Sequence, residues 1–332
     1  MAGRSMAVQI AQIQKEVSPG TAVTNAMLRP ASLRLRPGVH VEGGSSFTAA
    51  GANAPTAYMG GDEWGVWGVE GIQDYNTLGF IAESTLGAST TGAVADSAYT
   101  HVWTPKDFGA DVYATYTAQF GDSTIGVQGA QMVFNSLGIN IQRGTLGITS
   151  GALSRKLDFG ATVASAGVTT VPAVPIHPTS YNVYADDTWA TLGNTKLLAC
   201  YEFNVTNPDK YVPDSPINAA IDGFDQLIQA DGREFTVDIS VALDAAGTGL
   251  VASNFRANTL KFFRIETTGA LIGASSRYKL TYDLAVQITS VGEVTAQSGS
   301  NVATLPMTGQ LIIDPTSGKY QELTIINKLA GY

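Results

Sequence analysis

Alternation of apolar and polar residues is the dominant pattern along the chain, and it predicts β-strands. In residues 277–289 (RYKLTYDLAVQIT), every second residue from Tyr278 to Ile288 is apolar, and most of the residues between them are polar. Successive side chains of a strand point to opposite faces, so this pattern is typical of a long strand with one buried face. Residues 200–207 and 233–241 alternate in the same way, and we expect them to pair as a hairpin with an acidic and hydroxylic outer face.

A further hairpin is predicted over residues 137–149, where two alternating segments flank the turn sequence QRG. One of its faces is small and polar and includes Asn140, Gln142 and Thr145. Met132 and Phe134 have the opposite parity to Leu137. We therefore expect a β-bulge near residues 135–136 that re-aims the strand.

Two segments interrupt the β pattern. Residues 74–87 (DYNTLGFIAESTLG) begin with Asp74 as a candidate N-cap and end at Gly87, and one stripe holds Leu78, Ile81 and Ala82. We expect a short one-sided helix packed on the outside of the sheet. Residues 253–269 carry similar start and stop signals and favour a helix, although residues 259–266 fit a strand equally well.

The order of strands, short helix and further strands recurs on both sides of a Pro/Ala/Thr-rich stretch, which predicts an internal duplication. We expect an N-terminal arm (1–37), a first β-domain (38–158), a linker (159–190) and a second β-domain (191–332) with an acidic insertion at 207–232. Within the insertion, residues 215–228 have helical spacing, and both a solvated loop and an interface are open interpretations. The linker is too rich in Pro, Thr and Gly for a membrane helix, and no membrane contact is expected.

Charge is sparse and unevenly placed. The net charge is −9, and residues 181–250 carry eleven acidic against three basic groups, whereas residues 1–60 carry five basic against two acidic groups. A protein that binds nucleic acid by neutralising phosphates needs a surplus of Lys and Arg, so this class is disfavoured. The single cysteine, Cys200, excludes a disulfide framework within the chain and is expected to be a small buried hydrophobe.

No constellation for catalysis is evident. His40, His101 and His177 are far apart in sequence and lack metal-ligand spacing, and His101 is expected to be a structural imidazole. Neighbouring residues of a strand point to opposite faces, which disfavours catalysis by the pairs 62–63 and 186–187. The four tryptophans are expected to be core or interface anchors. We therefore expect no enzyme activity, no cofactor and no metal.

Several segments resemble the tail tube proteins of long-tailed bacteriophages. They are residues 74–87, SAYTHVWTPKD (97–107), ADVYATYTAQFG (110–121) and MVFNSLGINIQRGTLGITSG (132–151). The resemblance is best over residues 60–156 and is looser over 195–328, where it depends on strand order and the YKLTYDLAVQI strand. The arm and the acidic insertion depart from the pattern.

The resemblance implies a mainly β fold, an antiparallel β-sandwich or barrel of the tail tube type, with short helices outside. Such proteins form rings that stack around a tape-measure protein, meet tail-tip and terminator proteins, and later conduct DNA into the host. The implied location is the virion, with assembly in the host cytoplasm. Two tube folds in one chain would favour trimeric over hexameric rings.

The residues that would meet the bore or the next ring are assigned from the strand pattern and the charges. Candidate lumen-facing residues are Asn140, Gln142, Thr145, Glu202, Asn204, Glu234 and Asp238. Candidate contacts between stacked rings are Arg34, Arg36, Asp214, Asp222 and Asp225. The outer packing helix would use Leu78, Ile81 and Ala82.

Two other functions fit the same composition. One is another phage β-protein, such as a capsid decoration subunit, which would bind a capsid lattice. The other is a lectin-like or carbohydrate-active β-sandwich, for which a tryptophan-lined cleft would be expected.

Overall fold

The computed structural model describes residues 10–332, except for 44, 48–53, 56, 60, 106–112, 123, 143–146, 164–165, 215–222, 231–233 and 297–301. This part of the chain is mainly β: it forms one large, mixed but mostly antiparallel sheet with two short helices, and contains no closed barrel. The prediction of a mainly β, antiparallel fold is confirmed. None of the helices described is long and apolar enough to cross a membrane.

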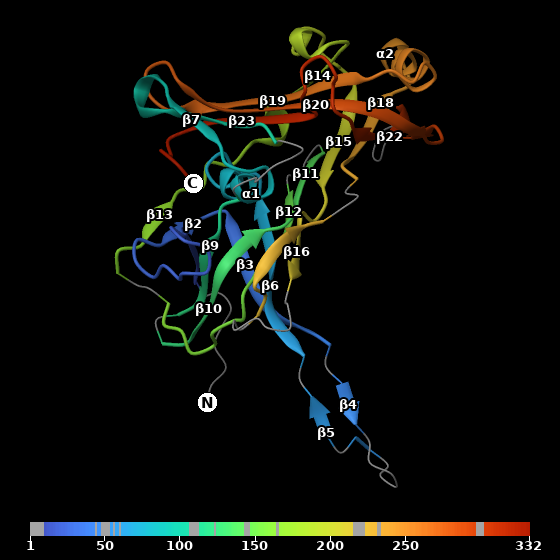
Figure 1. The fold of residues 1–332 in the computed structure, drawn as a ribbon. Coiled ribbons are helices and arrows are strands. Elements are labelled where there is room, and N and C mark those ends of the chain that lie inside the picture. Colours follow the sequence, from blue (N-terminus) through green and yellow to red (C-terminus); the bar gives the residue numbers. More distant parts are fainter. Residues whose placement is uncertain are drawn as a thin grey trace.

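Eight strands lie side by side, each antiparallel to the next, and we call them the central sheet (Figure 1). Their order across the sheet is β3 (Leu33–Glu42), β6 (Asp62–Ile72), β12 (Gly147–Ser154), β11 (Leu137–Gln142), β15 (Cys200–Asn207), β18 (Thr236–Ala242), β22 (Ala303–Leu311) and β20 (Arg277–Val291). The predicted strands at 200–207 and 277–289 are confirmed. The strand predicted at 233–241 is confirmed from Thr236 onward, and residue 233 lies outside the described residues. The predicted pair is confirmed too, because Phe203 of β15 lies opposite Ile239 of β18.

The remaining strands branch from this sheet at two places. Beyond β12 follow β10 (Gly126–Phe134), β9 (Tyr116–Gly121), β1 (Ile10–Lys15), β2 (Leu28–Pro30) and β13 (Thr169–Val171), the last two running parallel. Beyond β20 follow β19 (Lys261–Leu271) and β14 (Tyr181–Asp186) on one side, and β23 (Gln321–Asn327), β8 (Tyr99–Trp103) and β7 (Thr90–Ala93) on the other. The two-residue strand β21 (Thr295–Ala296) pairs with β22.

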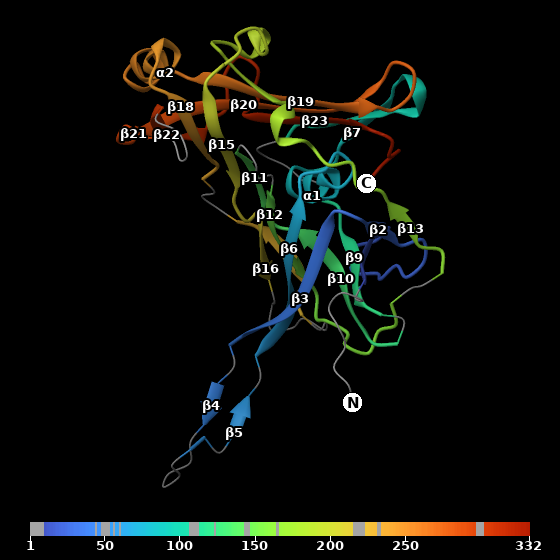
Figure 2. The same ribbon diagram turned by 180° about the vertical axis from the view of Figure 1, so that it is seen from behind.

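Two short ribbons extend from the body. The strands β4 (Ser45–Phe47) and β5 (Ala57–Met59) continue the β3–β6 hairpin in unchanged register, and they project away from the rest of the molecule (Figures 1 and 2). The strands β16 (Tyr211–Asp214) and β17 (Gln226–Gln229) form the second ribbon, within the predicted acidic insertion. Residue 228 is thus in a strand, and the helical spacing predicted for 215–228 is wrong there; residues 215–222 lie outside the described residues.

The predicted bulge between residues 134 and 137 is confirmed. Phe134 lies opposite Ala152, and Gly138 lies opposite Thr149. Between these two pairs the chain from Phe134 to Gly138 moves on by four residues, whereas β12 moves on by only three. The extra residue restores the parity of the buried side chains. As a result Phe134 and Leu137 both lie in the same core.

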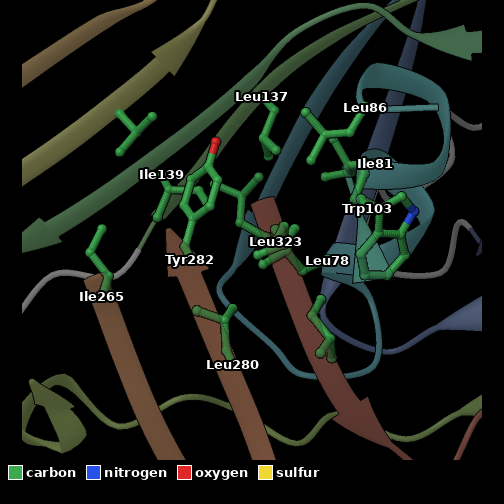
Figure 3. Packing of buried hydrophobic residues seen from close by; sticks show 14 of the residues in the cluster. Leu78, Ile81, Leu86, Trp103, Leu137, Ile139, Ile265, Leu280, Tyr282 and Leu323 are labelled. Atoms are coloured by element: carbon green, nitrogen blue, oxygen red, sulfur yellow. The ribbon is translucent and has the colours of Figure 1, made fainter. Parts of the chain in front are cut away.

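Helix α1 (Leu78–Thr85) is buried on all sides, and the prediction that it packs outside the sheet with one exposed face is wrong. Leu78, Ile81 and Ala82 are each 0% exposed, as the stripe predicted. The opposite side of the helix is buried too, because α1 lies between two groups of strands (Figures 1 and 2). Strands β19, β20 and β23 form one end of the molecule, and β3, β6 and β12 lie on the other side of α1. Figure 3 shows Leu78 and Ile81 beside Trp103 and Leu323.

Polar groups of α1 are satisfied inside the core. The Glu83 carboxylate pairs with Lys15 Nζ at 3.0 Å and accepts the Trp103 indole N–H at 2.8 Å. The helix begins at Leu78 with Thr77 as its N-cap, so Asp74 is not the cap. Instead the Asp74 carboxylate accepts the backbone N–H groups of Asn76 and Thr77 in the preceding turn. Because it is buried, the pKa of Asp74 is raised.

Two further expectations differ from the structure. The helix favoured for 253–269 is wrong: α2 (Ala245–Leu250) and a π-helical turn (Val251–Phe255) precede strand β19, which contains most of that segment. Residues 159–190, expected as a linker, contain β13 and β14 as well as 3₁₀ turns at Pro178–Ser180 and Trp189–Thr191. A third such turn lies at Ala95–Ser97. The division into two β-domains stays a prediction.

Candidate functional site

One side of the central sheet is polar across all eight strands, and we call it the polar face. A single row of directly opposed residues crosses it: Arg34, Glu70, Thr149, Gly138, Thr206, Thr236, Gln310 and Gln287. Each of them is at least partly exposed, whereas residues of the other parity, such as Leu35, Phe203 and Ile239, are buried. The sheet therefore separates a solvated surface from a continuous apolar core.

The structure brings five of the predicted lumen-facing residues together on this face. Asn140 lies opposite Asn204, which lies opposite Asp238 on the next strand, and Gln142 lies opposite Glu202. Glu234 is exposed and precedes β18 with the same parity as Asp238. Thr145 lies outside the described residues. That this face lines a channel stays a prediction.

Amide and hydroxyl groups hold the carboxylates of the polar face in place. Gln142 Nε2 and Asn204 Nδ2 both donate to Glu202 Oε1, at 2.7 and 2.6 Å. Thr308 Oγ1 donates to Asp238 Oδ1 at 2.7 Å. Beside them is an open hollow of about 500 Å³, lined among others by Asn140, Asn204 and Asp238. The face thus presents preorganised acceptors rather than free cations.

The charges on the polar face lean to the negative side. Four basic side chains share this side of the sheet with seven carboxylates. The basic residues are Arg34, Arg36, Arg277 and Lys279, and the acidic residues are Glu42, Asp62, Glu70, Glu202, Glu234, Asp238 and Asp283. Arg36 Nη2 is already paired with Glu70 Oε2 at 2.9 Å. Within the described ranges there is no group of three or more His, Cys, Asp or Glu able to hold a metal ion. Such a surface cannot neutralise a run of phosphates.

The predicted ring-to-ring residues lie on two separate features. Arg34 and Arg36 belong to β3, the outermost strand of the central sheet. Asp214 and Asp225 lie in or beside the β16–β17 ribbon, where the Asp225 N–H donates to the Asp214 carbonyl at 2.9 Å. Asp222 lies outside the described residues. No ion pair joins these arginines to these two aspartates within the described chain, and a contact between copies stays a prediction.

Other residues considered for chemistry have structural roles. Asp186, at the end of β14, accepts the backbone N–H groups of Gly193, Asn194 and Thr195 and so holds a turn. His101 is 0% exposed, lies 2.9 Å from both Thr91 Oγ1 and the Leu329 carbonyl, and has a pKa lowered by burial. Burial raises the pKa of the Cys200 thiol to about 12.

The tryptophans do not gather in one cleft. Trp67 and Trp103 are 2% and 0% exposed and belong to the main core, whereas Trp64 belongs to a separate cluster beneath the β16–β17 ribbon. Trp189 packs edge-on against Phe262 on the far side of the sheet from the main core. Three different clusters thus hold the four side chains, as expected for anchoring residues.

Two unpaired strand edges were not anticipated from the pattern of residues. Among the described strands, β3 pairs with β6 alone, so its outer edge has no hydrogen-bonded strand partner. The opposite end of the central sheet also has a free edge: β19 covers β20 only as far as Val286, and residues 287–296 pair only with β22. A signal was available for the first edge, because Pro37 lies within β3 and proline in a sheet favours edge strands.

No protein-family model matches the chain, and no curated protein matches it. The fold and the polar face therefore define a class rather than a family. The described part of the chain is mainly β, and its eight-stranded central sheet carries one extended polar face and, at each end, a strand edge without a partner.

Proposed function

We propose that the chain is a structural virion protein that assembles as rings into a hollow tail tube, through which phage DNA passes. The observation that carries the proposal is the polar face, which is continuous over eight antiparallel strands while the other side of the sheet is closed by the chain's own core. A sheet of this kind, joined edge to edge with copies of itself, would enclose an aqueous bore.

Strand order supports two tube-like folds in one chain. The first half of the central sheet runs β3–β6–β12–β11, and the second runs β15–β18–β22–β20. In the first half, the β3–β6 pair is followed along the chain by helix α1, and β12, the last of the four strands in sequence, lies beside β6. In the second half, the β15–β18 pair is followed by α2, and β22 lies beside β18 in the same way. Together with the resemblance to tail tube proteins, this repeat favours rings of three chains, with six equivalent half-sheets, over hexameric rings.

The charge of the polar face suits a conduit for DNA. Its seven carboxylates outnumber its four basic side chains, and Arg36 is already paired with Glu70. Phosphates would find few cations to bind, so DNA would slide without being held. The tape-measure, tail-tip and terminator proteins are the partners that such a tube would need.

Electron microscopy of the purified protein tests the proposal. Negative-stain images should show rings or tubes, and symmetry analysis should give a threefold ring with a pseudo-sixfold outline. Monomers or compact particles under all conditions would reject the tube. A capsid decoration subunit would instead bind a capsid lattice without forming a hollow polymer. A lectin would bind a glycan array.

A further inference from the structure

We infer that residues 287–296 of one copy pair, as an antiparallel strand, with the outer edge of β3 in a second copy. This inference rests on the proposed function and adds to it the contact that closes the ring. Its basis is that the two halves of the central sheet are already joined within one chain by an equivalent pair, β11 with β15. At the two outer ends of the central sheet, the strand edges equivalent to those of β11 and β15 have no partner within the described residues.

The equivalence can be followed residue by residue. In the first half, Arg34 lies opposite Glu70, Glu70 opposite Thr149, and Thr149 opposite Gly138. In the second half, Glu202 lies opposite Ser240 and Ser240 opposite Pro306, whose carbonyl accepts the Gly292 N–H at 2.8 Å. Residues 138 and 292 are both glycines at the same step of the repeat. The segment starting at Val291 therefore corresponds to β11, and β3 corresponds to β15.

The register of the proposed contact follows from this correspondence. Within the chain, Gly138 lies opposite Thr206 and Asn140 opposite Asn204. By the shifts that relate the two rows, residue 206 corresponds to 38 and 204 to 36, and residue 147 of β12, which continues the register toward Asn140, corresponds to Thr304. Thr304 lies opposite Thr295, because one extra residue lies between Gly292 and this pair, so Thr295 takes the position of Asn140. Thr295 should thus lie opposite Arg36 of the second copy, with both side chains on the polar face. The polar face would then continue unbroken from one copy to the next.

Both edges have the surface that such a contact needs. A groove of about 520 Å³ runs beside β3 and is lined by its own Leu33 and Leu35 and by Ile10 and Phe120 of neighbouring strands. Val39 at this edge is 43% exposed, and Val294 at the other edge is 51% exposed. Pairing would cover these side chains and the open backbone groups, which otherwise leave the sheet prone to uncontrolled association.

Each copy offers one edge of each kind, so the contact is head-to-tail. A contact of this type adds copies in one direction and ends only when the ring closes. Six equivalent half-sheets correspond to three chains.

Cysteine cross-linking tests the contact. Arg36→Cys and Thr295→Cys are made separately in a Cys200→Ala background, and the two proteins are mixed and oxidised. Directly opposed residues of paired strands are close enough for a disulfide, so a covalent dimer should form in the mixture. The Arg36→Cys/Thr295→Cys double variant should give a ladder that ends at a closed trimer. Arg36→Cys mixed with Thr289→Cys, six residues away along the chain, should give at most a few per cent of that dimer.

The outcomes separate this inference from the tube proposal. Rings in electron micrographs without the Arg36→Cys/Thr295→Cys cross-link would overturn the inference and leave the tube standing. The cross-link without rings would support the contact and reject the tube. Hydrogen exchange of the unmodified protein gives an independent readout: amides in 33–42 and 287–296 should become protected on assembly, and unchanged exchange at both edges would overturn the inference.

Discussion

Asn140 of β11 lies directly opposite Asn204 of β15, and this pair joins the two halves of the central sheet. Asn204 in turn lies opposite Asp238, so a row of polar side chains crosses the joint without interruption. Segments far apart in sequence thus build one surface. The pairing also provides the template for a contact between copies, because the same two kinds of edge are free at the ends of the sheet.

Reversing charge on the polar face should make the assembled protein bind DNA. In the Glu234→Lys/Asp238→Lys variant, two exposed carboxylates become cations, and phosphate contacts become available. We expect folding to be nearly unchanged, DNA to be retained at low salt and released at high salt, and infectivity to fall in phage that carry the variant. Retention is measured by co-sedimentation of assembled tubes with duplex DNA. Asp187→Lys, at an 87% exposed side chain in the turn after β14, is the control and should leave retention unchanged. Equal DNA retention by wild type and the double variant would place this face away from the bore.

Gly79→Ala should destabilise the protein even though alanine is the better helix former. A Cβ on Gly79 would lie 2.0 Å from the ring of Tyr332, which is buried against Phe80 and Trp103. Overpacking of this kind costs about 1–3 kcal/mol and outweighs the gain in helix propensity of about 1 kcal/mol. Chemical denaturation measures the change. Gly249→Ala in α2, where nothing lies within 4 Å, is the matched control and should be neutral or stabilising. A stabilised Gly79→Ala protein would mean that the C-terminus does not pack on α1.

Arg264→Met should be strongly destabilising because it strands a buried carboxylate. Arg264 donates to both oxygens of Asp283, at 2.6 and 2.8 Å, and Asp283 is 5% exposed. We expect a loss of about 3 kcal/mol at neutral pH, since removing one partner of a buried pair typically costs this much. The more exposed pair of Lys279 and Glu266 provides the control, and Lys279→Met should cost less than about 1 kcal/mol.

The same pair gives a pH dependence. Burial raises the pKa of Asp283 above its ordinary value of 3.8 despite the guanidinium beside it. The folded state then binds more protons than the unfolded state between these two pKa values, so this group lowers stability as pH rises through that window. Without the guanidinium the pKa of Asp283 is higher still, so the deficit of Arg264→Met should shrink as pH falls from the pKa of Asp283 in the variant to its pKa in the wild type. Asp283→Leu added to Arg264→Met should recover most of the loss. A deficit that does not vary with pH would show that lost packing, not the stranded charge, causes it.

His101 should make the protein less stable in mild acid. Burial lowers its pKa below the ordinary value of 6.5, so the unfolded state binds more protons between the two values and stability falls as pH drops through 6.5. Thermal unfolding between pH 7.5 and 5.5 should show a smaller pH slope for His101→Gln than for wild type. His177→Gln, at an exposed position, should keep the wild-type slope. Identical slopes for all three proteins would assign the acid sensitivity to other groups.

Cys200 should be nearly inert toward thiol reagents in the folded state. With its pKa raised to about 12, the thiolate fraction at pH 8 is minute, and alkylation should be at least about a hundredfold slower than for an ordinary thiol. The rate is measured with a chromogenic disulfide reagent, and unfolding in denaturant should restore ordinary reactivity. The exposed thiol of Val294→Cys serves as the fast control in the dissociated protein. Rapid labelling of native wild type would contradict the raised pKa of this half-buried thiol.

Local periodicity accounts for what could be predicted of the fold. The strands at 200–207, 236–242 and 277–291 follow from alternation over six or more residues, and the bulge before Leu137 follows from the change of parity. Alternation also assigned Asn140, Asn204 and Asp238 to a common polar side, because side-chain parity is a local property of a strand. Residues 259–266 were ambiguous because their propensities suit either state, and pairing with β14 and β20 decides for strand β19.

By itself the sequence determined where most strands run, which of their faces is polar, and that a short helix includes Leu78, Ile81 and Ala82, since these depend on neighbours a few residues away. Only the tertiary structure decided that this helix is buried on every side, because its coverings, Tyr332 and Trp103 among them, come from distant segments. It also decided that β11 meets β15 and that β3 keeps a free edge, because strand partners are selected by long-range packing and not by the alternation within each strand.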